Sequence, residues 1–186
     1  MLAVLLLPTS AYSQSYKKLR VGAGLGITDI SATGAGVLFH VEPSVRVNDQ
    51  IAVGLRIETN FRHGNLPVLG SYSLNGQYYF RTKEKVRFFG GLGAGVYSTN
   101  TTPIGSCTCE SGPTETVVGV YPRFGFDDGH FTLQIEYNFV PAMTNQFTQS
   151  IPSTTPPQYE KVSMNYFAFK FGFFIGGGRK SVRSSK

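Results

Sequence analysis

The sequence predicts an all-β protein, an eight-stranded antiparallel up-and-down β-barrel. Three observations support this: polar and apolar residues alternate, the number of alternating segments is even, and the connectors alternate between short and long. In "FTLQIEYNF", residues 131–139, every odd-numbered residue is aromatic or aliphatic and every even-numbered residue is polar. The stretches "IAVGLRIETN" (51–60) and "NYFAFKFGF" (165–173) alternate in the same way. A β-strand points successive side chains to opposite faces, so each stretch is a strand with one strongly apolar face.

The same test along the chain gives eight strands. They are expected at residues 18–28, 34–47, 51–62, 68–82, 86–98, 115–126, 130–140 and 162–176. Short polar turns, "NDQ", "KEK" and "DDG", follow the second, fourth and sixth strands. The connectors after the fifth and seventh are long and rich in Ser, Thr and Pro. Proline cannot donate a ladder hydrogen bond, so we expect local bulges at Pro43 and Pro122.

The composition of the two strand faces favours a membrane barrel over a soluble, lipocalin-like barrel. The apolar face carries more Phe, Tyr, Val and Leu than the interior of an eight-stranded barrel can hold. The opposite face combines Arg, Glu, Asn and Gln with glycines, whereas a face in water would carry many Lys. Charged residues make up only 15% of the chain, against about 25% in soluble domains. The early Gly-x-Trp feature of lipocalins is absent, because the chain has no Trp. The glycines of the polar face are Gly22, Gly24, Gly26, Gly54, Gly91, Gly93, Gly95, Gly119 and Gly172.

With its even strand count, short turns and longer loops, the chain resembles the small eight-stranded outer-membrane β-barrel proteins of Gram-negative bacteria, the OmpA-, OmpX- and OmpW-like group. It resembles especially the short porin-family barrels common in Bacteroidetes. The resemblance is one of pattern and covers Lys17 to Gly177. It implies an outer-membrane location and contact with membrane lipid and lipopolysaccharide. It also implies help from the barrel-assembly machinery during biogenesis, with the long loops facing outward.

Three segments are expected along the chain. Residues 1–13 read as a cleaved signal peptide, because the apolar run Leu2–Leu7 is followed by Ala11 and Ser13, small residues in the spacing of a signal-peptidase site. A buried N-terminal segment is the alternative. Residues 14–177 form the barrel domain, and residues 178–186, "GRKSVRSSK", form a basic periplasmic tail.

The polar face predicts what fills the lumen. Its mid-strand ionisable residues predict a central plug of ion pairs, since buried charges must be paired or hydrated. The lumen network is expected to contain His40, Glu42, Arg56, Glu58, Gln134, Glu136 and Lys170. A second set of arginines falls in the half of the barrel near the short turns, with too few carboxylates to neutralise them. We hypothesise that water or small anions fill this positive mouth. The set is Arg20, Arg46, Arg81, Arg87 and Arg123.

Other sites receive little support from the sequence. Cys107 and Cys109 lack the second ligand pair of a structural zinc site, and they can form a small disulfide loop or remain free. The glycine runs "VGAGLGIT" and "GGLGAGVYS" lack Gly-x-Gly-x-x-Gly spacing and precede no helix, so they form no phosphate-binding loop. The net charge of +6 is scattered over turns and ends, which is not typical of nucleic-acid binding. No metal or cofactor is expected.

These observations lead to one functional prediction and two alternatives. A structural, adhesion or surface-binding role would use the long loops Thr99–Glu115 and Pro141–Lys161 and an extracellular ligand that the sequence does not identify. The first alternative is a narrow pore or transporter for small anions or apolar solutes. The second is a lipid A-modifying enzyme built on His130, Thr132 and Glu136. Thr132 stands where such enzymes have Ser, and His130 falls at the turn end, so no enzyme activity is predicted.

Overall fold

The structure, a computed structural model, describes residues 16–30, 34–62, 68–80, 85–100, 115–146 and 159–177. The predicted signal peptide, the basic tail, Arg81 and both cysteines lie outside these residues. Most of the loop 99–115 also lies outside them. In the part of the chain that is described, no helix is long and apolar enough to cross a bilayer.

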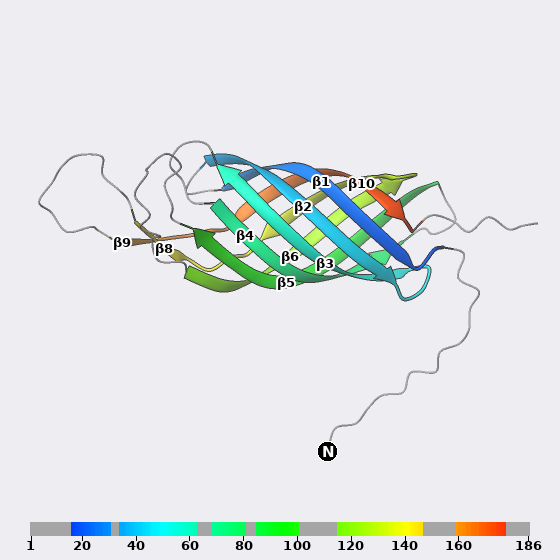
Figure 1. The fold of residues 1–186 in the computed structure, drawn as a ribbon, viewed down its shortest axis with the longest axis horizontal. Coiled ribbons are helices and arrows are strands. Elements are labelled where there is room, and N and C mark those ends of the chain that lie inside the picture. Colours follow the sequence, from blue (N-terminus) through cyan, green and yellow to red (C-terminus); the bar gives the residue numbers. More distant parts are fainter. Residues whose placement is uncertain are drawn as a thin grey trace, which may run out of the picture.

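Eight strands close into one antiparallel barrel, as the alternation predicted (Figure 1). Around the ring the order is β1, β10, β7, β6, β5, β4, β3, β2. The first and last strands therefore pair with each other, and the barrel has no free edge. The strand ends lie within four residues of the expected ones. The strands are β1 (Leu19–Ile30), β2 (Gly34–Arg46), β3 (Ile51–Arg62), β4 (Val68–Tyr79), β5 (Val86–Asn100), β6 (Glu115–Asp128), β7 (Phe131–Asn138) and β10 (Tyr166–Gly176).

The short turns and both described ends of the chain lie at one end of the barrel, which we call the turn end. The amide of Gly177 donates to the carbonyl of Leu19 at 2.8 Å, and the amide of Arg46 donates to the carbonyl of Lys18 at 2.8 Å. The opposite end, which we call the loop end, carries the two longest connections, from β5 to β6 and from β7 to β10 (Figure 1). There the chain adds a short hairpin that the alternation did not predict, formed by β8 (Met143–Gln146) and β9 (Tyr159–Val162).

The predicted bulges at the two prolines are wrong. Pairing between β2 and β3 is interrupted at Pro43. The last pair before the gap is Val41↔Ile57 and the first pair after it is Ser44↔Gly54, so both strands advance by three residues across the gap. The ladder between β6 and β7 is interrupted at Pro122 in the same way. No extra residue is inserted in either ladder. Each proline remains paired on its other side, with β1 or β5, and this pairing keeps the strand in register.

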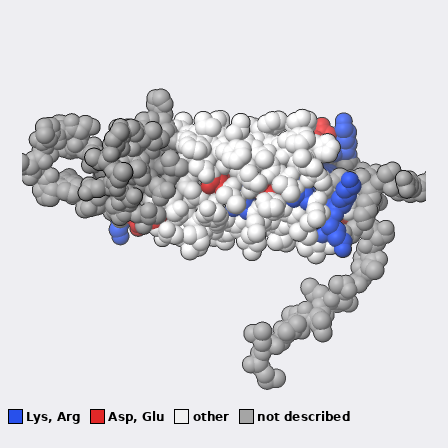
Figure 2. Space-filling view, in the orientation of Figure 1, with Lys and Arg blue, Asp and Glu red and all other residues white. Residues whose placement is uncertain are grey.

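The outer wall of the barrel is apolar around its whole circumference. Exposed aliphatic and aromatic side chains come from all eight barrel strands, and Leu92 and Ile175 are each 71% exposed. Figure 2 shows this wall as mostly uncharged, with Lys and Arg gathered at the turn end. Monomeric soluble proteins rarely expose apolar patches larger than a few hundred Å². In lipid, a closed barrel satisfies every strand hydrogen bond, so this wall is the surface of a membrane-spanning protein.

Candidate functional site: the barrel lumen

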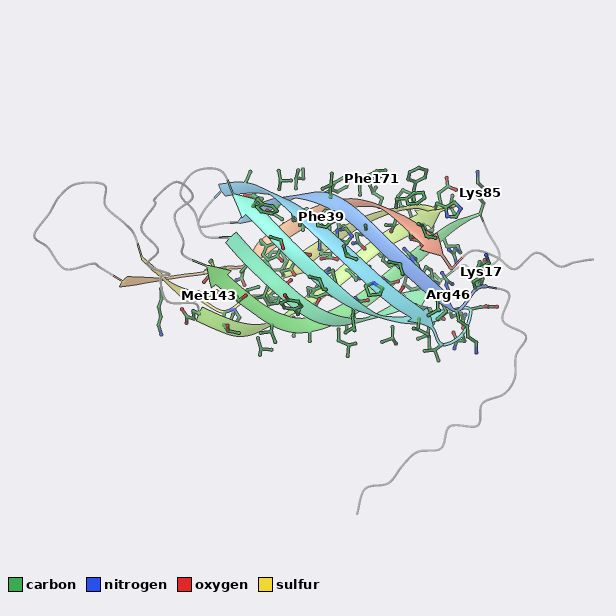
Figure 3. The ribbon with its side chains drawn as sticks, viewed as in Figure 1. Lys17, Phe39, Arg46, Lys85, Met143 and Phe171 are labelled. Carbon is green, nitrogen blue, oxygen red and sulfur yellow. The ribbon has the colours of Figure 1, made fainter. Side chains whose placement is uncertain are left out.

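The side chains opposite the apolar wall fill the lumen (Figure 3). Every described residue of the two predicted lumen sets is buried there, with 8% or less of its surface exposed. These residues are Arg20, His40, Glu42, Arg46, Arg56, Glu58, Arg87, Arg123, Gln134, Glu136 and Lys170. Their contacts divide them into three layers, which we call central, middle and turn-end.

The central layer is a charge-balanced network of two cations and two carboxylates. Lys170 Nζ donates to Glu58 Oε2 at 2.5 Å and to Glu136 Oε2 at 2.6 Å. Arg56 Nη1 donates to Glu136 Oε1 at 2.5 Å, and Arg56 Nε lies 3.3 Å from Glu58 Oε2. The Tyr166 hydroxyl donates to Glu58 Oε1 at 2.7 Å. Each charge is paired, which is the condition for keeping ions in a site from which water is excluded.

This network spans the lumen from wall to wall. Arg56 is on β3 and Glu136 is on β7, and these strands lie four positions apart in either direction around the ring of eight. The ion pair therefore follows a diameter of the barrel. The Arg56 guanidinium also lies 3.9 Å from the centre of the Tyr121 ring. Together these contacts close the middle of the barrel.

The middle layer is a second connection across the barrel. Arg123 on β6 donates to Glu42 Oε2 on β2 at 2.8 Å, and these strands are also opposite in the ring. Arg123 donates in addition to Gln134 Oε1 at 2.7 Å, and Gln77 donates to Glu42 Oε1 at 3.0 Å. Arg123 thus has a carboxylate partner and does not belong to an unneutralised mouth.

The turn-end layer contains three buried arginines and one buried carboxylate among the described residues. Arg20 donates to both oxygens of Asp127, at 2.6 and 3.2 Å, and to the Tyr79 hydroxyl at 2.7 Å. Within the described residues, Arg87 Nη2 lies 3.5 Å from Asp127 Oδ2, and Arg46 donates to the backbone carbonyl of Asp49 at 3.5 Å. The prediction that these arginines lack carboxylate partners is therefore wrong for Arg20 and Arg123. Arg46 and Arg87 are the two that remain without a close carboxylate partner among the described residues.

Aromatic rings cover these two arginines. The Arg46 guanidinium lies 4.8 Å from the centre of the Tyr16 ring and 4.4 Å from that of Tyr79. The Arg87 guanidinium lies 4.5 Å and 5.2 Å from the same rings. Tyr16 precedes β1, lies outside the barrel strands and is only 6% exposed. A residue from the N-terminal segment therefore covers the lumen at the turn end.

The loop end of the lumen contains a buried apolar cluster that the sequence analysis did not predict, beside buried polar side chains such as Thr28, Asn60 and Asn138. A buried cluster, which we call the apolar cap, joins strand residues to residues beside or within the β8–β9 hairpin. Met143 and Met164 are each 1% exposed, and Figure 3 places Met143 at this end. The Val140 amide donates to Asn165 Oδ1 at 2.9 Å and ties the two sides of the hairpin's base together. The cap comprises Leu38, Leu69, Tyr97, Val140, Met143, Met164, Tyr166 and Ala168.

The glycines of the polar face leave the space that these large side chains occupy. A Cβ added at Gly93 would overlap the Tyr121 ring, and one added at Gly119 would lie 2.8 Å from the Tyr97 ring. At Gly26 it would lie 2.9 Å from the Lys170 side chain. The glycine runs are therefore barrel wall, and their lack of side chains lets long polar groups meet across a narrow lumen.

The isolated histidines do not form a ligand set. His40 is buried in the lumen, and its Nδ1 has no hydrogen-bond partner among the described residues. His130 is exposed in the turn before β7, with Nδ1 3.0 Å from the carbonyl oxygen of Phe174. Within the described residues, no group of three His, Cys, Asp or Glu side chains is arranged to hold a metal ion.

Some lumen residues were missed for two different reasons. Asp127 shares the parity of Arg123 on β6, so an extension of the predicted strand by one residue would have placed it inside. Tyr16 and Met143 lie outside the alternating segments, so no periodic signal marks them. Their positions depend on how the chain crosses the two barrel ends.

Comparisons with known proteins agree with this architecture. Neisserial surface protein A has a TM-score of 0.60 at 14% sequence identity, with 85% of this chain and 96% of that chain covered. The outer-membrane protein OprG of Pseudomonas aeruginosa has a TM-score of 0.56 at 13% identity, with 88% and 98% covered. No protein-family model and no curated protein matches the sequence. The chain is therefore a transmembrane β-barrel that shares the fold of the small eight-stranded outer-membrane proteins of Gram-negative bacteria.

Proposed function

We propose that this protein is a closed, rigid outer-membrane scaffold that binds a partner or a polysaccharide through its loop end. The observation that carries the proposal is the blocked lumen. The central ion pairs span the barrel's diameter, and the apolar cap packs above them. An eight-stranded interior is just wide enough for side chains to fill, so passage through the lumen would require several buried ion pairs to separate.

The β8–β9 hairpin supports a binding role for the loop end. Its base is fixed to the barrel by the buried side chain of Met143 and by the bond between Val140 and Asn165. Binding residues are often found on loops that a rigid scaffold positions. The segment predicted to bind, Pro141–Lys161, begins at this fixed base.

The alternatives are less compatible with the geometry. A pore for small anions or apolar solutes needs a continuous path, which the three polar layers and the cap interrupt in the described lumen. A lipid-modifying enzyme needs a base beside its nucleophile. The His130 Nδ1 atom faces the Phe174 carbonyl, and the Thr132 hydroxyl has no hydrogen-bond partner among the described residues. We therefore propose a role without catalysis.

Two measurements test this function. Purified protein in planar bilayers should show no steady conductance. Cells that display the protein should adhere to polysaccharide-coated or protein-coated surfaces, and replacing residues 147–158 with a Gly-Ser linker should abolish adhesion. The linker leaves both described strands of the hairpin in place, and unchanged heat-modifiable gel migration would show that the barrel still folds. Steady conductance by the wild type, or full adhesion by the linker variant, would contradict the proposal.

A further inference from the structure

We propose that the turn end of the lumen is a binding site for a small oxyanion, with Arg46 and Arg87 as its donors and the Tyr16 side chain as a stopper that the anion displaces. The site lies at the opposite end of the barrel from the proposed binding loops. It therefore concerns a second ligand, on the other side of the membrane.

The first argument is unsatisfied hydrogen bonding. Arg46 and Arg87 are 3% and 5% exposed. Three of their nitrogens, Arg46 Nε, Arg46 Nη2 and Arg87 Nη1, are buried and have no hydrogen-bond partner in the described structure. Guanidinium donors left unpaired away from water destabilise a protein, and each would gain by meeting an acceptor.

The second argument is charge. Among the described residues, Asp127 is the buried carboxylate that contacts this pair, 3.5 Å from Arg87, and Arg20 already donates to both of its oxygens. The exposed lysines Lys17 and Lys85 lie at the same end of the barrel as Arg46 (Figure 3). An anion approaching this end meets a positive surface first and then two buried guanidinium groups.

The third argument is the nature of the stopper. The Tyr16 ring interacts with both guanidinium groups through its face, and such cation–π contacts leave the donors in the guanidinium plane unmet. Phosphate and carboxylate oxygens match those donors directly, often in pairs. Both guanidinium groups lie against the Tyr16 and Tyr79 rings, and we infer that an anion reaches their donors when Tyr16 moves aside. Tyr16 lies outside the barrel strands and forms a β-bridge, so its movement breaks that bridge and leaves the pairing of β1 with β2 and β10 in place.

The ligand class is a small oxyanion, with phosphate as the representative probe. A phosphate group can reach the turn end as a free ion or as the headgroup of an anionic lipid in the adjoining leaflet. Both sources would present the same phosphate oxygens to Arg46 and Arg87. The experiment therefore compares detergent solution, which contains only the free ion, with lipid nanodiscs.

The chain contains no Trp, which makes Tyr16→Trp a single fluorescent reporter at the stopper. In uncharged detergent, sodium phosphate titrated at constant ionic strength should shift the emission to longer wavelength and reach saturation, whereas chloride should not. Arg46→Gln and Arg87→Gln should each raise the half-saturating phosphate concentration by roughly tenfold or more. Lys161→Gln removes an exposed cation at the loop end, away from the proposed site; it is the control and should leave the half-saturating concentration unchanged.

The outcomes separate clearly. A shift in detergent supports a free-anion site. A shift that appears only in nanodiscs containing phosphatidylglycerol supports a lipid-phosphate site. The proposal is wrong if neither preparation responds, or if Lys161→Gln weakens the response as much as Arg46→Gln. If Tyr16→Trp fails to give a heat-modifiable barrel, calorimetric titration of the wild type with phosphate replaces the reporter. Saturable heat that Arg46→Gln/Arg87→Gln removes is then expected, and equal heat in both proteins would overturn the site.

Discussion

The centre of the lumen and its turn end both bury arginines, yet they stabilise them in different ways. Arg56, at the centre, has two carboxylates within 3.3 Å and crosses the barrel to the opposite strand. Arg46, at the turn end, has two tyrosine rings and a single long contact to a backbone oxygen. The centre is a closed set of ion pairs, whereas the turn end holds cations whose hydrogen bonds are incomplete. The ion pairs at the centre stabilise the fold, whereas the unpaired guanidinium nitrogens at the turn end could bind a ligand.

The largest expected effect is at the centre, from Glu136→Gln. Glu136 is the carboxylate shared by Arg56 and Lys170, so its loss leaves uncompensated positive charge in a site that excludes water. We expect the free energy of unfolding to fall by about 3–5 kcal/mol. Urea unfolding in phospholipid vesicles, followed by far-ultraviolet circular dichroism, measures this change. Asp29→Asn removes an exposed carboxylate on the outer face and should change the value by less than about 0.5 kcal/mol. An equal loss of unfolding free energy in Glu136→Gln and Asp29→Asn would show that the central ion pairs do not stabilise the barrel.

A smaller effect is expected from filling the space beside the central layer. A Cβ at Gly95 would overlap the Tyr72 carbonyl oxygen and the Ser73 backbone, which cannot move without shifting a strand. Gly95→Ala should therefore lower the free energy of unfolding by about 1–3 kcal/mol. Gly76→Ala is the control, because a Cβ there would meet nothing within 4 Å. The same urea unfolding experiment measures both variants. If Gly95→Ala is as stable as Gly76→Ala, then the lumen beside Gly95 has room for a methyl group and the explanation is wrong.

The smallest effect is expected at the turn end. Arg46→Gln removes a buried cation without orphaning a carboxylate partner, so we expect a change in unfolding free energy within about 1 kcal/mol. Arg56→Gln is the matched substitution at the centre and should cost about 3–5 kcal/mol, because it leaves Glu136 with less compensation. Similar losses from the two arginines would remove the distinction between the layers.

The prediction from sequence was accurate where strand geometry alone decides the outcome. Strand number, wall and lumen faces and the burial of Arg56, Glu58 and Lys170 all follow from a side-chain period of two. The predicted bulges failed because a proline can lose one hydrogen bond while the neighbouring ladder keeps its strand in register. The positive mouth was overestimated because Asp127, the partner of Arg20, lies just beyond the predicted end of its strand, and because barrel closure sets Glu42 opposite Arg123.

The sequence by itself determined which face of each strand meets lipid, because alternation is a local property of the chain. Only the tertiary structure decided which lumen side chains meet. Arg56 and Glu136 are 80 residues apart in the sequence, and they pair because barrel closure sets β3 opposite β7. The two barrel ends depend on closure in the same way. Tyr16 and Met143 come from segments without periodicity, and their places at the turn end and in the apolar cap exist only once eight strands have formed a ring.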